Sequence, residues 1–142
     1  MPLRLIPSIH RATHQIALYL DRLENLGVTQ AEAHILAHLA SSGDSTVADL
    51  HRAFGHKRST LTSILDRLAA RELVTREVSE TDRRSFVVSL TRSGQPIAAT
   101  VLDRLSTLER RALAGVPKEA MTNLQAALAR IEEAAAMASG ES

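Results

Sequence analysis

Residues 59–94 read STLTSILDRLAARELVTREVSETDRRSFVVSLTRSG, and their pattern predicts a helix followed by a β-hairpin. The apolar residues of its first part recur at three- and four-residue steps, which define one buried face of a helix: Leu61, Ile64, Leu65 and Leu68. Two strand-like runs follow, 73–79 and 85–90, with the polar segment 80–84 between them. A short helix that leads into a basic β-hairpin is typical of a winged helix, in which the helix enters the major groove of DNA and the hairpin lies beside it.

The polar sides of the helix and the hairpin carry residue types that suit DNA. The helix face opposite the apolar residues holds small hydroxyl residues, with arginine at its flank, and these can approach base edges or bind phosphate. An ordinary solvated helix face explains this part of the pattern equally well. At the hairpin tip, Arg83 and Arg84 cannot pack inward, and they would meet a duplex backbone or a narrow groove.

The distribution of charge supports the same segment as the DNA-binding one. The whole chain has a net charge of only +1. Residues 52–92, however, hold nine Arg or Lys and five Asp or Glu, a local charge of +4, and the rest of the chain sums to −3. The positive charge therefore lies on the helix and hairpin that are predicted to contact DNA.

Composition excludes several classes of protein. The 142 residues fit one domain, and 44% of them are hydrophobic, but the aromatic rings are only one Tyr and two Phe. So few rings argue against a stacking platform for single-stranded nucleic acid. The absence of cysteine excludes disulfides, thiol redox sensing and thiolate zinc sites. The first residues have no apolar run of signal-peptide or membrane-span length, so we expect a cytoplasmic protein without a membrane partner.

Further helices are expected on both sides of the winged segment. Apolar periodicity predicts a first helix over about 8–26, and capping-box patterns at 29–32 and 46–49 begin a second and a third helix. A fifth helix is expected over about 91–114, and a last helix follows Pro117. The last helix has a narrow apolar seam: Met121, Leu124, Leu128, Ile131, Ala135 and Ala138. Such a seam suits a partner helix and favours a dimer, although packing within the subunit is the alternative.

The motifs of the hairpin carry a specific resemblance. Asp82-x-Arg84, then five residues, then Leu90-Thr91 and Gly94 match the wing signature of the MarR family of bacterial transcriptional regulators. Other matching segments are Thr29-Gln30, Ser59 to Thr62, Leu65 to Leu68 and Leu73 to Arg76. The chain thus resembles that family over about half its length, residues 29–94.

The resemblance implies a mainly α-helical fold with a small β-hairpin wing. The single domain 1–142 would comprise a winged helix-turn-helix lobe, 28–92, and a helical dimerisation region, 1–27 and 93–142. The protein would be a homodimer that binds an inverted-repeat operator in double-stranded DNA, most often as a repressor, without a cofactor. The implied contacts are base edges or phosphate for Thr60, Thr62, Ser63 and Arg67, backbone for Arg58 and Ser59, phosphate for Arg83 and the minor groove for Arg84.

Two residues near the wing carry separate expectations. Asp82 would repel DNA if it were free, so we assign it to a salt bridge with Arg76 that orders the wing. Glu72 stands where the family usually has glycine, just after the helix that is expected to enter the major groove, here called the recognition helix. A non-glycine residue there would cost about 1 kcal/mol in a left-handed conformation, or it would force a different turn.

The resemblance also implies release from DNA by a small ligand, commonly a phenolic or other aromatic acid, although the sequence names none. Two histidine pairs at i, i+4 are candidates for such a site: His10 and His14 with Arg11, and His34 with His38. No acidic residue or cysteine completes a metal site, so structural histidines are favoured over metal ligands.

Three other functions compete with a regulator of this kind. His34 to His38 lack the glutamate of a zinc-hydrolase motif and no phosphate loop or nucleophile elbow is present, so an enzyme is disfavoured. A winged helix that binds protein in place of DNA is the alternative, and a metal-responsive regulator of the same fold is another.

Overall fold

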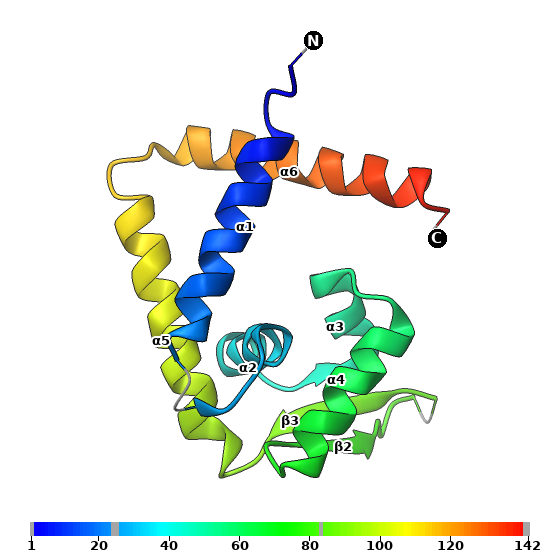
Figure 1. Cartoon of the computed structure of the whole chain (residues 1–142). Coiled ribbons are helices and arrows are strands. Elements are labelled where there is room, and N and C mark those ends of the chain that lie inside the picture. The colour runs from blue at the N-terminus through cyan, green and yellow to red at the C-terminus, as the bar shows by residue number, and fades with distance from the viewer. Residues whose placement is uncertain (1, 24–25, 83, 141–142) are drawn as a thin grey trace. The chain divides into compact units, whose positions relative to one another are not determined.

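The computed structural model describes residues 2–23, 26–82 and 84–140, and within them it contains six helices and three strands (Figure 1). In chain order these are α1 (Ile6–Asp21), α2 (Gln30–Ser42), β1 (Ser45–Thr46), α3 (Val47–Phe54), α4 (Arg58–Ala70), β2 (Val74–Val78), β3 (Phe86–Leu90), α5 (Gly94–Ala112) and α6 (Lys118–Ala138). The predicted mainly helical fold with a β-hairpin wing is confirmed.

The first helix starts earlier and ends earlier than its apolar pattern predicts. Pro7 lies in the first turn of α1, where its missing N–H would have no helical partner in any case. After Asp21 the pattern continues as turns, because the N–H groups of Leu23 and Leu26 donate to carbonyls three residues back, both at 2.9 Å. The apolar periodicity beyond residue 21 therefore reflects packed turns and not helix.

The hairpin belongs to a three-stranded antiparallel sheet of order β1-β3-β2. Val74 pairs with Leu90 at one end of the hairpin and Val78 with Phe86 at the other. The short strand β1, which the sequence analysis did not predict, pairs Ser45 with Val88. It ties the start of α3 to the wing, so the helix-turn-helix and the hairpin share one sheet.

Two clusters of apolar side chains hold residues 1–105 together as one compact unit. The larger cluster joins α2, α3, α4 and the sheet, and it includes all four residues of the predicted α4 stripe, none of which is more than 2% exposed. The smaller one joins α1 and α2 to the first part of α5 through Leu20, Ala37 and Val101. The apolar face of α4 thus holds the helix in place, and its polar face is exposed to solvent.

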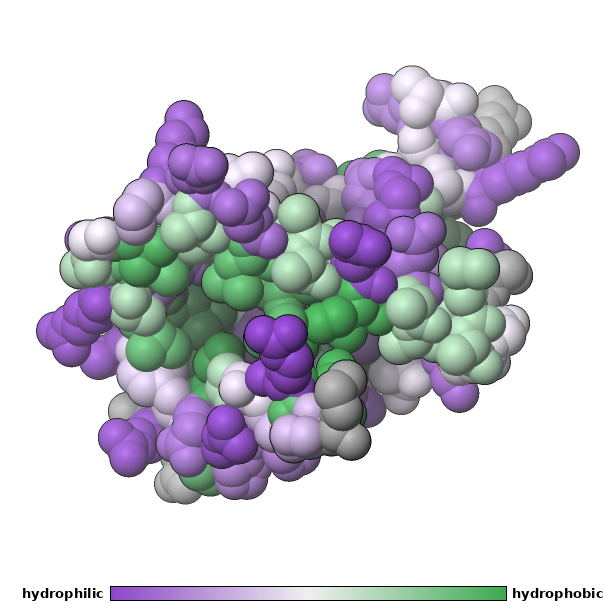
Figure 2. Space-filling model, turned by 90° about the horizontal axis from the view of Figure 1, so that it is seen from above, coloured by the Kyte–Doolittle hydropathy of each residue, from purple (hydrophilic) through white to green (hydrophobic). Residues whose placement is uncertain are grey.

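Residues 106–142 form a second compact unit that contains α6. Every residue of α6 is described, and none of them is buried; Leu124 and Leu128 are 42% and 39% exposed. Exposed apolar side chains, drawn in green, are also visible on the face of the molecule that Figure 2 shows. Exposed leucines at helical spacing indicate a surface that suits another helix. No described helix is long and apolar enough to cross a membrane.

The turn between α4 and the wing accommodates Glu72 by a left-handed backbone. Its φ is 58°, and it is the non-glycine residue with positive φ in the described chain. The N–H of Leu73 donates to the Leu68 carbonyl (3.0 Å) and that of Glu72 to the Ala69 carbonyl (2.9 Å), which is the hydrogen-bond pattern of a Schellman helix end. Glu72 therefore keeps the turn that glycine would make, at the cost of local strain.

Glu72→Gly is expected to stabilise the protein by about 1 kcal/mol, because glycine adopts this conformation without the clash of a β-carbon. Urea denaturation followed by circular dichroism measures the change. Glu77→Gly, in the exposed middle of β2, is the control and should destabilise. A Glu72→Gly protein less stable than the wild type would contradict the strain assigned to this turn.

Candidate nucleic-acid interface

The polar face of α4 presents the residues that the sequence singled out. Ser59, Thr60, Thr62, Ser63 and Arg67 are all exposed, while the leucines one step away are buried. Arg58 is the first residue of the helix, at the end where backbone N–H groups attract anions. The helix thus offers short hydroxyl side chains along its length and a guanidinium group at its start.

The tip of the wing is held in shape by Ser79 and Asp82. The buried Ser79 hydroxyl accepts hydrogen bonds from the N–H groups of Thr81 and Asp82, both at 3.3 Å. The Asp82 carboxylate in turn accepts the N–H of Arg84 at 3.0 Å. These bonds leave the Arg84 side chain exposed at the tip. Arg83, predicted to touch phosphate, lies outside the described residues.

The salt bridge predicted between Asp82 and Arg76 is wrong. Arg76 Nη1 binds Asp66 Oδ1 of α4 at 2.6 Å. Arg76 lies in the middle of β2, opposite Val88, within reach of α4, whereas the Asp82 carboxylate is used by the backbone of the tip. Asp82 still orders the wing, through a hydrogen bond. The Arg76–Asp66 pair adds a link between the wing and α4 and neutralises the one acidic residue on the exposed face of that helix.

A pocket of about 480 Å³ lies between α3, α4 and the wing. Four arginines line it: Arg52, Arg58, Arg76 and Arg84. Its apolar lining comes mainly from Val47, Leu61, Leu65 and Phe86, and Thr62 also reaches it. The fold therefore brings three predicted contact residues, Arg58, Thr62 and Arg84, to one concave and positively charged surface, although they are up to 26 residues apart in sequence.

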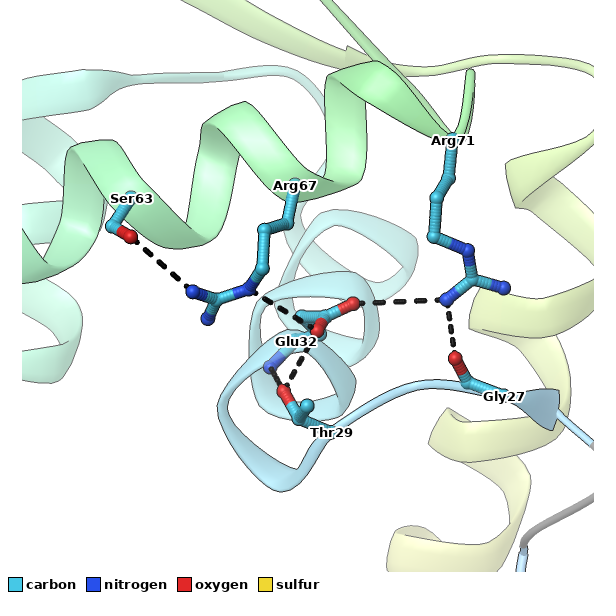
Figure 3. A network of polar contacts seen from close by, with 6 residues as sticks. All are labelled: Gly27, Thr29, Glu32, Ser63, Arg67 and Arg71. Atoms are coloured by element: carbon cyan, nitrogen blue, oxygen red, sulfur yellow. Dashed lines mark hydrogen bonds and ion pairs between the residues drawn. The ribbon is translucent and has the colours of Figure 1, made fainter.

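Arg67 is held by a network of hydrogen bonds and ion pairs that the sequence did not indicate (Figure 3). Its Nε lies 3.6 Å from Oε1 of Glu32 in α2, and its Nη1 donates to the Ser63 hydroxyl at 3.2 Å. Glu32 was expected only to complete a capping box with Thr29. Thr29 does accept the Glu32 N–H (3.3 Å), but the carboxylate accepts the Thr29 hydroxyl (2.9 Å) and turns toward α4. No local pattern could indicate this contact, because Glu32 and Arg67 are 35 residues apart.

Comparison with known proteins places this geometry in a family. A sequence profile described as the MarR family matches residues 26–85. The HTH-type transcriptional repressor MdtR of Bacillus subtilis (strain 168) is 30% identical over 116 residues, which cover 82% of this chain and 75% of MdtR. The chain belongs to the MarR family. The HTH-type transcriptional regulator PecS of Dickeya dadantii (strain 3937) is 31% identical over 136 residues, 93% of this chain and 82% of PecS.

Solved structures of other proteins share the fold. MarR from Oenococcus oeni PSU-1 matches with a TM-score of 0.84 at 24% identity, over 92% of this chain and 99% of that one. The MepR–DNA complex of S. aureus matches with a TM-score of 0.74 at 20% identity, over 94% and 99%. The family resemblance predicted from the wing motif is thus confirmed. As a MarR-family protein, the chain is a DNA-binding transcriptional regulator and not an enzyme.

The histidines of the two candidate pairs are not among the described residues that line the pocket of this MarR-family protein. His10, Arg11 and His14 are exposed on α1. His34 and His38 are half-buried on α2, where the His38 ring packs edge-on against Phe54 (5.4 Å between centroids) and Phe54 stacks on His56 (5.9 Å). Among the described residues, no group of three or more His, Cys, Asp or Glu side chains could hold a metal ion.

Acid is expected to destabilise this MarR-family protein through His34. Burial, and to a smaller extent the charge of His56, lower the pKa of His34 from its ordinary value of 6.5. The unfolded chain then binds a proton more readily than the folded chain as the pH falls below 6.5, so stability is full above that pH and declines below it. Urea denaturation at about pH 7.5 and about pH 5.5 should show this decline, and His34→Gln should reduce it. An equal decline in the variant would exclude His34 as its source.

Proposed function

We propose that the protein is a sequence-specific repressor that acts in the cytoplasm and binds an inverted-repeat operator as a homodimer. The observation that carries this proposal is the convergence of Arg58, Thr62 and Arg84 on the concave surface between α4 and the wing. A helix face of small hydroxyls beside a basic hairpin matches the shape of a major groove with its adjacent backbone. Guanidinium groups on α4 and on the wing supply the charge that phosphate binding needs.

Each contact residue has a distinct role in this proposal. Thr60, Thr62 and Ser63 face base edges in the major groove, and Arg67 lies at the flank of the same face. Arg58 and Ser59 bind the backbone phosphate at the start of α4, where the helix dipole favours an anion. Arg84 enters the minor groove from the wing tip, and Arg83 binds phosphate.

The homodimer is supported by the exposed apolar seam of α6. Leu124 and Leu128 lie one turn apart, and both are more than a third exposed. Met121 and Ile131 extend the seam at three-residue steps on either side. A second copy would bury this seam and join two DNA-binding lobes in one protein, as an inverted repeat requires.

The double variant Leu124→Asp/Leu128→Asp is expected to be monomeric, because a dimer would bury two unpaired carboxylates from each subunit. Sedimentation velocity measures the change from the wild-type dimer. Ala126→Asp/Arg130→Asp, which alters exposed residues of the same helix outside the seam, is the control and should stay dimeric. A dimeric seam variant would place the interface elsewhere.

We also propose that a small aromatic acid releases the protein from DNA by occupying the pocket between α3, α4 and the wing. The apolar lining of the pocket suits a ring, and its arginines suit a carboxylate. A ligand there would use Arg58 and Arg84, so it would compete directly with phosphate. With 2-hydroxybenzoate as the probe, the apparent Kd for DNA should rise linearly with the concentration of the probe. Benzyl alcohol, which has no carboxylate, should have no effect. Equal effects of both compounds would contradict the pocket assignment.

Selection of duplexes from a random-sequence library by the wild-type protein tests the proposed function. We expect enrichment of one sequence with two inverted half-sites whose centres are about one helical turn apart. Enrichment of a single unrepeated half-site would contradict the dimeric arrangement. A library that remains random after selection would contradict sequence-specific binding and favour a winged helix that binds protein.

A further inference from the structure

The carboxylate of Glu32 is buried between two arginines of the recognition helix. Its side chain is only 5% exposed, and it belongs to α2, not to α4. Oε1 lies 3.6 Å from Arg67 Nε, and Oε2 lies 3.8 Å from Arg71 Nη1. A charged carboxylate is retained in such a place only when it is paired, so Glu32 and the two guanidinium groups form one ionic unit.

Arg67 is the member of this unit that reaches the DNA-facing side of α4. Glu32 lies beside its Nε edge, and Nη1 donates to the hydroxyl of Ser63, one turn earlier on the exposed face (Figure 3). The Arg67 side chain is still 51% exposed. A guanidinium group fixed at one edge and exposed at the other loses less conformational freedom when it meets DNA than a mobile side chain does.

Arg71 faces the same carboxylate but has a different environment. Its Nη1 donates to the carbonyl of Gly27, in the turn that precedes α2, so it clamps the end of α4 to that turn. It lies one turn beyond Arg67, farther from the start of the helix where Arg58 and Ser59 are placed. Arg71 therefore provides a matched control: the same charge and the same partner, without a place in the proposed DNA surface.

We propose that Glu32 is a positioning residue for DNA recognition, which acts by holding Arg67 in the orientation that binds the operator. This inference rests on the proposed function, because it assumes that the exposed face of α4 reads DNA. Glu32 contributes through specificity and not through attraction, since its own charge repels phosphate. Loss of that charge should weaken operator binding while non-specific binding stays equal or increases. A residue that only stabilised the fold would not separate the two kinds of binding.

The test compares operator and non-specific affinity in a set of variants, by fluorescence anisotropy. The operator probe is the duplex that the wild type selects, and the non-specific probe is its scrambled sequence. Glu32→Gln keeps the size of the side chain and a hydrogen bond to Thr29, and we expect it to lose about fivefold in operator affinity, the cost of ordering one long side chain. Its affinity for the scrambled duplex should not fall.

Two double variants show which arginine Glu32 acts through. In an Arg67→Ala background, Glu32→Gln should cause no further loss of operator affinity. In an Arg71→Ala background, it should cause the same loss as in the wild type. Should Glu32→Gln fail to fold, Glu32→Asp replaces it. Aspartate keeps the charge but is one methylene shorter and holds Arg67 less closely, so operator affinity should fall and scrambled-duplex affinity should not.

Three results would overturn the inference. They are wild-type operator affinity in Glu32→Gln, an equal loss on both duplexes, or a loss that persists in the Arg67→Ala background and vanishes in the Arg71→Ala background. Each leaves the proposed function intact, because the wild type would still prefer its operator. A wild type that binds both duplexes equally would instead overturn the proposed function, and this inference with it.

Discussion

Gly94→Ala is expected to lower the free energy of unfolding by about 3 kcal/mol or more, since overpacking against backbone is costly. A β-carbon on Gly94 would lie 2.0 Å from the carbonyl oxygen of Leu73 and 2.9 Å from its carbonyl carbon. That oxygen also accepts the N–H of Thr91 at 3.1 Å. The Leu73 backbone cannot shift away without breaking its hydrogen bonds to Thr91 and Leu68, which connect α4, the wing and the start of α5.

Urea denaturation followed by circular dichroism measures this loss, and Gly115→Ala is the matched control. A β-carbon on Gly115 would meet no other part of the described chain within 4 Å, but the φ of Gly115 is +80°, so alanine there should cost only about 1 kcal/mol. A Gly94→Ala protein as stable as the Gly115→Ala protein would show that the contact between Gly94 and Leu73 is not tightly packed. Position 94 of the wing signature therefore requires glycine because a β-carbon does not fit there, and not because the backbone adopts a positive φ.

Arg84→Ala is expected to reduce operator affinity roughly tenfold to a hundredfold, the range for one well-placed groove contact. The side chain extends from a tip that Ser79 and Asp82 hold by backbone hydrogen bonds, so the fold should survive its loss. Anisotropy with the selected duplex measures the affinity, and sedimentation velocity checks that the variant has the oligomeric state of the wild type.

Arg104→Ala is the control for the loss of one positive charge. Arg104 is exposed on α5 and is not among the described residues that line the pocket. Its variant should bind the operator within about twofold of the wild type, because a distant exposed charge is screened by salt. Equal losses for Arg84→Ala and Arg104→Ala would mean that the wing tip contributes charge alone.

The sequence was sufficient for features that depend on neighbours along the chain. The stripe of Leu61, Ile64, Leu65 and Leu68 is buried as its spacing indicates, because helical periodicity is a local property. The capping box at Thr46 forms completely, with both of its hydrogen bonds at 3.0 Å. The two wing strands, β2 and β3, lie within one residue of their predicted ends.

Contacts between distant segments could not be predicted in the same way. The salt bridge expected for Asp82 is wrong for the same reason. An acidic residue at a basic tip suggests an ion pair, but the backbone of the turn competes for the same carboxylate. Arg76 and Asp66 are ten residues apart on different elements, and only the packing of the wing on α4 brings them together. Glu32 and Arg67 meet for the same reason, through the packing of α2 on α4.

We propose that the surface formed by α4 and the wing recognises a DNA sequence. The binding of the wild type to its selected duplex and to a scrambled one tests this proposal. Fluorescence anisotropy at physiological salt should give an affinity for the selected duplex about a thousandfold or more above that for the scrambled one. Both affinities should fall with added salt, because phosphate contacts dominate the charge term. Equal affinities that disappear together at moderate salt would contradict sequence-specific binding by this surface.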